Sequence, residues 1–300
     1  MSQSNEYNVE TFFPFKLVEE VIDILKEKNC TFLTYSELDL SLFHQRLDEL
    51  SYALEFVHYQ MGNPHGIAKL SLWTEFLLYK LFKKERLASF LKRKDMRKTP
   101  AVILQHDADQ QPFKTIDLMK LEERCGVVSS SYFFKTQNFD TNGNYTLDIN
   151  ELQRLEQKGF EIGYHLNAYE LADYDLEKAF KIVNSDLDFF NRHFNLRTFV
   201  PHGGHPSKNG LNNHLLPYKG RLRKYPWCYN GFGFSHHAMW SDGNIYFEDL
   251  EDPRIVASNL KNGQRAMFLM HPQYYGNELS SRYSELPVSR ESWWKNLWNL

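Results

Sequence analysis

The chain has 300 residues, of which 42% are hydrophobic and 15% aromatic, enough for one large domain or for a core domain with an appendage. Its formal net charge of −3 argues against a nucleic-acid-binding protein, whose affinity rests on a concentrated basic surface. The basic cluster at 92–98 is best interpreted as a solvated helix end. Because no run of about 18 apolar residues occurs, we expect no membrane span.

The cysteines indicate a reducing compartment. Cys30, Cys125 and Cys228 form no CxxC pair, so neither a disulfide framework nor a thiolate zinc site is indicated. Residues 1–15 contain early acids and no apolar core of signal-peptide length. We therefore expect a soluble, cytoplasmic protein.

The N-terminal part, residues 1–97, is predicted to be mostly helical. Apolar residues recur at helical spacing in 17–28 and in 72–93, with a short β-like segment at 31–35 between them. These apolar stripes need a partner surface, and no flexible linker precedes Pro100. We expect a helical N-terminal extension packed on the rest of the chain.

After Pro100 the predicted strands and helices alternate, which favours stacked βαβ units around a parallel sheet. From residue 210 onward the pattern is less regular. The predicted strands are 101–107, 129–134, 160–166, 197–204, 231–236, 244–249 and 265–271, and the predicted helices are 115–126, 147–159, 176–194 and a closing one at 289–300.

The stretch AVILQHDADQQPF at 101–113 places His106, Asp107 and Asp109 at the end of a hydrophobic strand. An Asp after a strand is often only a turn former. Two Asp at i and i+2 on extended backbone, however, point to the same side and repel unless a cation or a proton lies between them. This pattern indicates a site that draws partners from elsewhere in the chain.

Other predicted strands also end in polar side chains, namely His165, His202 with His205, and His271. In parallel α/β proteins, ligands bind at the carboxyl ends of the strands. A single strand-end histidine is more often structural. Histidines that serve unrelated structural roles, however, should be spread along the strands and not gathered at the same end. The coincidence therefore favours a shared site. Imidazole and carboxylate suit zinc or a similar divalent ion, and groups left over could act as base and acid.

The order of these motifs over 100–275, HDAD after an apolar strand, then EIGYH, PHG and LMHP, resembles the polysaccharide deacetylase family, carbohydrate esterase family 4 (the NodB-homology domain). The resemblance implies a distorted (β/α) barrel over 98–300, with 1–97 outside it. It also implies site roles: Asp107 as general base, Asp109 and His165 as metal ligands, His271 as general acid, and Asp242 in WSDGN as the carboxylate that orients His271.

Further positions match the substrate side of the family's site. Pro201 and Gly203 match a motif whose loop backbone helps to stabilise an oxyanion, and His202 lies within it. An aromatic surplus that includes Trp240 would suit stacking on sugar rings, although core packing is the alternative for such residues. We expect His202, Gly203 and Trp240 to contact substrate.

Two positions depart from the family pattern. Tyr169 stands where the second metal-binding His would be, and Phe199 stands where an Arg would hold the base. Catalytic zinc normally has three protein ligands, so a third must come from elsewhere. His205 or His202 could supply it, and His205 is favoured because His202 lies within the oxyanion-loop motif.

The resemblance therefore implies an enzyme, a zinc-dependent hydrolase that removes an acetyl group from an amino sugar or an acetylated glycan precursor in surface-polysaccharide biosynthesis. A catalytically inactive carbohydrate-binding barrel is one alternative, motivated by the missing His and Arg. The other is a metal-dependent amidohydrolase acting on a small non-sugar amide, since related folds serve such chemistry.

Overall fold

The computed structural model describes residues 12–37, 99–139, 147–203, 213, 222, 238–243 and 251–277. Its strands are β1 (Phe13–Pro14), β2 (Thr31–Phe32), β3 (Ala101–Ala108), β4 (Ser130–Phe133), β5 (Glu161–Leu166), β6 (Phe199–Pro201), β7 (Ala238–Ser241), β8 (Arg265–Met270) and β9 (Tyr275–Gly276). Its helices are α1 (Phe15–Glu27), α4 (Phe113–Arg124), α5 (Lys135–Asn138), α6 (Ile149–Gln157), α7 (Ala168–Leu171), α8 (Leu176–His193), α9 (Pro253–Asn259) and the 3₁₀ turns η1 (Tyr35–Glu37) and η7 (Pro272–Tyr274).

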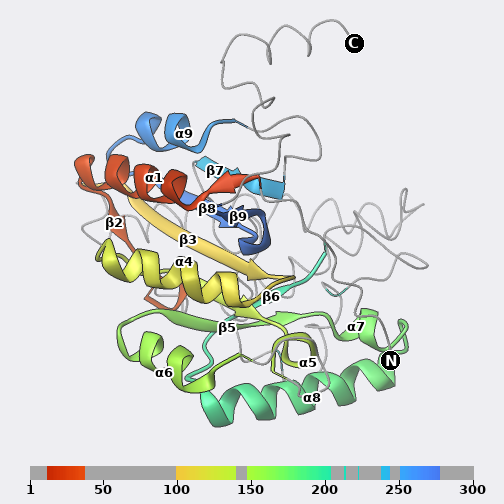
Figure 1. The fold of residues 1–300 in the computed structure, drawn as a ribbon. Helices are drawn as coiled ribbons and strands as arrows, with labels where there is room; N and C mark the ends of the chain where they lie inside the picture. The colour runs from red at the N-terminus through yellow and green to blue at the C-terminus, as the bar shows by residue number, and fades with distance from the viewer. Residues whose placement is uncertain are drawn as a thin grey trace, which may run out of the picture.

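Within these residues the fold is α/β, built on a seven-stranded sheet (Figure 1). Six strands follow the order β6-β5-β4-β3-β8-β7, and the seventh, β2, pairs with β3. The strand pairings in this sheet are parallel. All eight residues of the central strand β3 are buried, as expected for a parallel strand covered on both faces. The α/β fold predicted from the sequence is confirmed.

The sheet curls into an open half-barrel whose inward side chains meet. A core cluster joins Ile103 of β3, Tyr132 of β4, Val200 of β6 and Met267 of β8 with Tyr35, which follows β2. Side chains from β6 and β8, well separated in the strand order, reach one cluster only because the sheet is curved. A Cβ on Gly163 would lie 2.2 Å from the Tyr132 ring, so glycine is required there.

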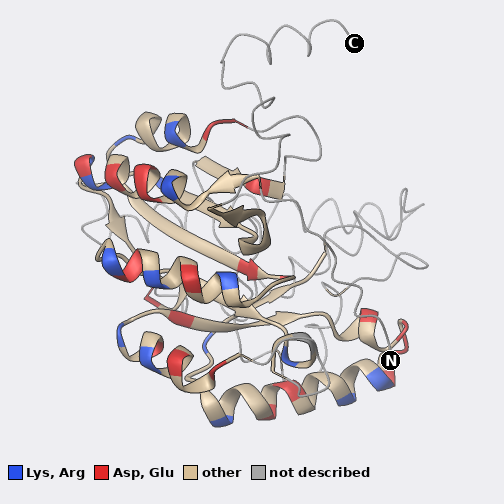
Figure 2. Ribbon diagram, in the orientation of Figure 1, with Lys and Arg blue, Asp and Glu red and all other residues tan. Residues whose placement is uncertain are grey.

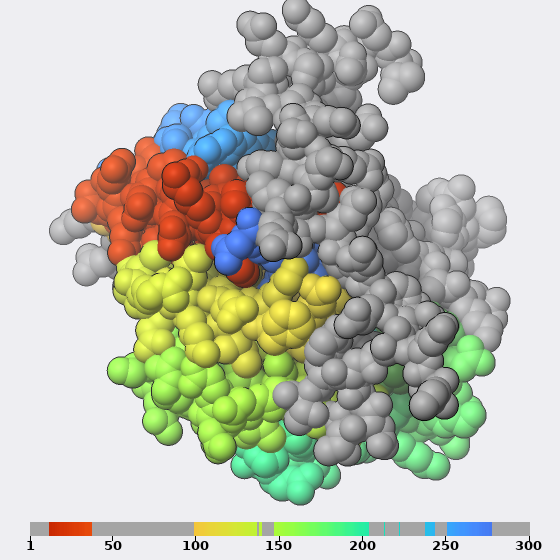
Figure 3. Space-filling model, viewed as in Figure 1, coloured from red at the N-terminus to blue at the C-terminus, as the bar shows by residue number. Residues whose placement is uncertain are grey.

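Helices cover the outer side of the half-barrel. One core cluster packs α6 and α8 on β4, β5 and β6, and another packs α1 and α9 on β3, β7 and β8, with α4 contributing to both. The surface of α1 adjoins those of α9 and α4 (Figure 3). Charged residues lie mainly along the helices (Figure 2). This arrangement leaves the carboxyl ends of the strands as the place where polar groups gather.

Helix α1 follows from its sequence. Leu17, Val18, Val21, Ile22 and Leu25 are buried at the i, i+3, i+4 spacing of an amphipathic helix. Burying each such side chain contributes roughly 1.5–3 kcal/mol, so the helix is held by its contact with the sheet more than by intrinsic propensity.

The predicted elements that fall on described residues are confirmed within a few residues. The short strand at 238–241 and the helix at 253–259 were not predicted, because four and seven residues are too few to show a period. The predicted elements at 72–93, 231–236, 244–249 and 289–300 lie outside the described residues.

The described N-terminal segment joins the sheet itself. Thr31 and Phe32 pair with Ala101 and Val102 of β3, and β1 pairs with β9. A domain boundary at 97–98 stays a prediction, because 38–98 lie outside the described residues. Cys30 and Cys125 are free thiols. In the described part of the chain, no helix is both long and apolar enough to cross a bilayer.

Candidate functional site

The carboxyl ends of β3, β5, β6, β7 and β8 bring six polar side chains together. Parallel strands all point the same way, so the residues that end them share one edge of the half-barrel. These residues are Asp107 from β3, Asp109 directly after it, His165 from β5, His202 after β6, Asp242 after β7 and His271 after β8.

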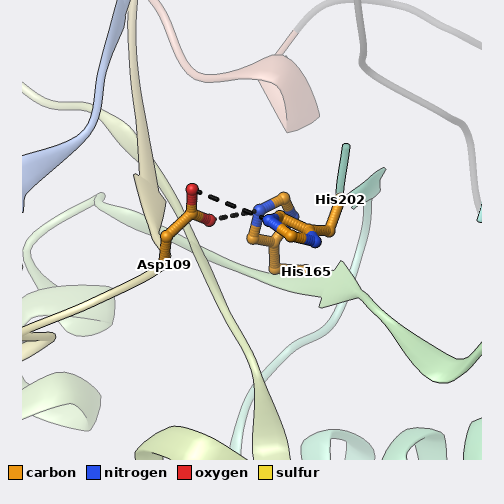
Figure 4. Close-up of side chains that lie close together, drawn as sticks. All are labelled: Asp109, His165 and His202. Carbon is orange, nitrogen blue, oxygen red and sulfur yellow. Dashed lines mark hydrogen bonds and ion pairs between the residues drawn. The ribbon is translucent and has the colours of Figure 1, made fainter. Parts of the chain in front are cut away.

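Asp109 lies at the centre of the group. Its Oδ1 is 2.9 Å from Nε2 of His165, and its Oδ2 is 3.8 Å from Nε2 of His202 and 3.8 Å from Nε2 of His271. Asp109, His165 and His202 each offer a ligand atom, and these atoms lie within 4.8 Å of one another (Figure 4). One carboxylate and two imidazoles form a donor set that suits zinc or a similar divalent ion.

The surroundings of His165 fix its ring. Its Nδ1 donates a hydrogen bond of 2.9 Å to the backbone carbonyl of Val200, which turns Nε2 toward Asp109. Metal-binding histidines usually donate their second ring nitrogen to a carbonyl or carboxylate in this way. Phe134 stacks on the His165 ring at 4.6 Å and meets the His202 ring edge-on at 5.2 Å. Both imidazoles are therefore held by packing as well as by hydrogen bonds.

His202 is held on two sides. Its Nδ1 donates to Oε2 of Glu170 over 2.8 Å, and its backbone amide donates to the carbonyl of Leu166. Burial would lower the pKa of His202, but the Glu170 carboxylate and Asp109 raise it above its ordinary value. The His202 amide is thus used within the fold, and the oxyanion role expected for the loop backbone around Pro201 and Gly203 stays a prediction.

The charge of Asp109 depends on its neighbours. Burial alone would raise the pKa of its carboxyl group, but the hydrogen bond from His165 and the nearby His271 and His202 hold it well below its ordinary value. Asp109 is therefore ionised at neutral pH, the form a metal ligand needs.

Asp107 is buried and faces the same space. Its Oδ2 lies 4.0 Å from Nε2 of His165, and its Oδ1 accepts a 2.9 Å hydrogen bond from the Gln105 amide. The Oε1 of Gln105 in turn accepts from the Tyr35 hydroxyl over 2.9 Å. Phe199, which stands where the family pattern has an Arg to hold the base, is buried in the core. In the described part of the chain, Gln105 thus donates the hydrogen bond that holds Asp107.

His271 and Asp242 form a two-point pair. The backbone amide of His271 donates to Oδ2 of Asp242 and its Nδ1 donates to Oδ1, each over 2.6 Å. Burial opposes protonation of His271, but Asp242 outweighs it and raises the pKa of His271 to about 10. Burial raises the pKa of the Asp242 carboxyl group, and the neighbouring His271 opposes that rise. His271 is thus a cation whose Nε2 faces Asp109.

Other expected site residues lie elsewhere. Tyr169 is buried and packs in the core beside Tyr174, and burial raises the pKa of its phenol, so it offers no ligand. Trp240 packs against Phe13 and Phe268 and donates to a backbone carbonyl, which places it in the core rather than on a substrate-facing surface. His205 lies outside the described residues, so its expected role as third ligand is untested.

Three contributing residues were not foreseen: Gln105, Tyr35 and Glu170. The contact of Gln105 could have been predicted from the sequence, because Gln105 precedes Asp107 by two residues on a strand and so points to the same face. The contacts of Tyr35 and Glu170 could not have been predicted, since they span 70 and 32 residues of sequence.

The comparisons with known proteins find a likeness in structure only. No family model matches the chain, and no curated protein matches it in sequence. A mutant of the peptidoglycan deacetylase PdaC from Bacillus subtilis is 13% identical, with a TM-score of 0.37, over 69% of this chain and 98% of that one. A mutant of a CE4-family pseudoenzyme, with restored enzymatic activity, is 13% identical, with a TM-score of 0.32, over 66% of this chain and 62% of that one. At these values the function must be argued from the chain's own residues.

Proposed function

We propose that the protein is a metal-dependent hydrolase that removes an acetyl group from an amino sugar or an acetylated glycan precursor. One observation carries the proposal: Asp109 lies between two candidate ligands, His165 and His202, and a His271–Asp242 pair whose carboxylate is buried. Asp107 lies beside this group. A metal site, a carboxylate base and a cationic acid can together catalyse amide hydrolysis at neutral pH. The sugar substrate rests on the resemblance of the motifs to the polysaccharide deacetylase family.

Asp109, His165 and His202 would hold the ion, and zinc suits their donor set. When bound, a divalent ion activates water and polarises an acyl oxygen. The fit is supported by the hydrogen bonds from the second nitrogens of both imidazoles, which leave each Nε2 facing Asp109. Such hydrogen bonds fix the tautomer that a metal ligand needs.

Asp107 would accept the proton of the attacking water. Gln105 bonds only one of its oxygens in the described structure, and the other faces the Nε2 of His165. A base must be ionised and near the proton that it removes. The hydrogen bond from a neutral amide orients the carboxylate without adding a positive charge that would weaken it as a base.

His271 would donate a proton to the leaving nitrogen or oxygen. Its pKa of about 10 makes it a cation at neutral pH, and both of its bonds to Asp242 fix the ring so that Nε2 points into the site. Expelling an amine without protonation is unfavourable, so a positioned acid contributes typically about 10²–10⁴-fold. The carboxylate of Asp242 also keeps this cation from a costly unpaired burial.

The test is release of acetate by the purified, zinc-loaded full chain. The substrate panel should contain N-acetylated and O-acetylated sugars, sugar nucleotides, and small non-sugar amides. Turnover of a sugar substrate that is lost in His271→Gln is the expected result. Turnover of the small amides alone would replace the sugar substrate with the amidohydrolase alternative. Zinc binding without any hydrolysis would favour the inactive carbohydrate-binding barrel.

A further inference from the structure

Helix α7 contains the position at which the family pattern has a second metal-binding histidine. A different side chain of this helix contacts the site. Tyr169, four residues after His165, turns into the core. The side chain of the next residue, Glu170, is 36% exposed and contacts His202 instead. The helix thus contributes to the site through a hydrogen-bond acceptor and not through a ligand.

The two nitrogens of His202 face different partners. Nδ1 is 2.8 Å from Oε2 of Glu170, and Nε2 is 3.8 Å from Oδ2 of Asp109. Because a carboxylate can only accept, Nδ1 carries the hydrogen, and the lone pair of a neutral ring lies on Nε2. The contact with Glu170 therefore selects the tautomer that can bind a metal.

The backbone around this contact is also tied together. The buried side chain of Asn213 accepts from the amide of Tyr169 over 2.9 Å and donates to the carbonyl of His202 over 3.0 Å. Gly203, next to His202, has a φ of +75°, a conformation that favours glycine. A Cβ there would lie 3.5 Å from Oε1 of Glu170. The loop after β6 and helix α7 are thus fixed relative to each other.

We infer that Glu170 is a positioning residue for the metal site: it holds His202 in the orientation and tautomer in which Nε2 binds the ion beside Asp109 and His165. The inference rests on the proposed metal site. It accounts for the loss of a ligand at position 169, because the third ligand comes from the loop after β6 and α7 supplies the group that orients it. Loss of such an outer hydrogen bond typically weakens metal affinity about 10- to 100-fold.

The experiment measures the zinc affinity of the full chain by competition with a chromogenic chelator at constant pH. The variants are Glu170→Gln, Glu170→Ala, His202→Ala, His205→Ala and the double variant Glu170→Ala/His202→Ala. Glu177→Ala, which removes an exposed carboxylate on neighbouring α8, and Tyr169→Phe serve as matched controls. Thermal unfolding without metal reports whether each variant folds. If Glu170→Ala fails to fold, Glu170→Gln, which keeps an oxygen acceptor, carries the comparison.

We expect Glu170→Ala to weaken zinc binding about 10- to 100-fold, with Glu170→Gln in between and both controls equal to the wild type. The double variant should bind zinc no more weakly than His202→Ala, because the carboxylate acts only through that ring. The visible spectrum of the cobalt-substituted protein should change in Glu170→Ala.

Three results would overturn the inference. Equal affinity in Glu170→Ala and the wild type would leave the carboxylate without a role at the metal. Normal zinc binding in His202→Ala, with loss in His205→Ala, would assign the third ligand to His205 and leave the proposed function standing. A wild-type chain that binds no zinc would overturn the proposed function as well.

Discussion

Gln105 donates a 2.9 Å hydrogen bond to Asp107 from two residues earlier on the same strand, and both side chains are buried. The pair lies on the inward face of β3, where alternation along a strand puts both residues on one side. Through Tyr35, the bond extends to the N-terminal segment of the chain. A residue far from the motifs thus supports the proposed base.

Replacing Gln105 with Met, which is similar in size, should lower kcat about 10- to 100-fold with little change in KM. A hydrogen bond to a charged group contributes about 1.5–3 kcal/mol, and its loss here would fall on the orientation of the base. Zinc content, measured by elemental analysis, should stay at the wild-type level. Tyr35→Phe, which removes only the hydroxyl beyond Gln105, should reduce kcat less. A rise in KM with unchanged kcat would contradict the positioning role.

Substitutions of Asp107 and Asp109 should have different effects on metal binding and turnover. Asp109→Ala should abolish zinc retention, because its carboxylate lies 2.9 Å from Nε2 of His165 and 3.8 Å from Nε2 of His202. Asp107→Asn should keep the metal and lose turnover by about 10²–10⁴-fold, the usual contribution of a general base. Asn can still accept from Gln105, so the fold should be unaffected. Loss of zinc in Asp107→Asn would reassign that residue as a ligand.

The convergence of Asp107, Asp109, His165 and His271 could be predicted from sequence. Each follows or ends a strongly apolar strand, and a parallel sheet brings all strand ends to one edge. The pairing of Asp242 with His271 was implied only by a short motif, and the structure places the two in contact at 2.6 Å. This part of the site was predictable because the alternation of strands and helices indicates a parallel sheet, and the topology of such a sheet brings the strand ends together.

The choice between His202 and His205 as a third ligand could not be made from the sequence. Which imidazole after β6 faces Asp109 depends on the turn at Gly203, and the orientation of α7 decides whether Tyr169 or Glu170 faces the site. A helix of four residues has no measurable period. Trp240 failed as a substrate contact for a related reason: its strand is too short for its two faces to be told apart.

A chain that begins at residue 98 should be markedly less stable than the full chain. It would lack β2, the apolar face of α1 and the Tyr35 ring that fills the half-barrel. Replacing Tyr35 alone with Ala should cost about 3–5 kcal/mol, as for other large aromatic side chains in cores. Urea denaturation measures both effects, with a chain that begins at residue 12 as the control. Equal midpoints for the chains beginning at residues 12 and 98 would show that the N-terminal segment is dispensable.

The last prediction concerns Glu161, which lies buried at the start of β5, away from the strand ends that form the site. It accepts hydrogen bonds from Ser130 over 2.6 Å, Thr198 over 2.7 Å and the backbone amide of Ser36 over 3.2 Å. Burial raises its pKa above the ordinary value, and the hydrogen bonds oppose that rise without cancelling it. The folded chain therefore keeps this proton at pH values where the unfolded chain has lost it.

The free energy of unfolding should consequently fall as the pH rises from about 4.3, the ordinary pKa of Glu, through the raised pKa in the folded state. The slope from one proton is at most about 1.4 kcal/mol per pH unit. Glu161→Gln cannot ionise and should lack this contribution, so wild type and variant should differ most in slope just above pH 4.3. Urea denaturation at pH 4.5, 5.5, 6.5 and 7.5 measures both curves. Parallel curves over this range would show that Glu161 ionises equally in the folded and unfolded chain.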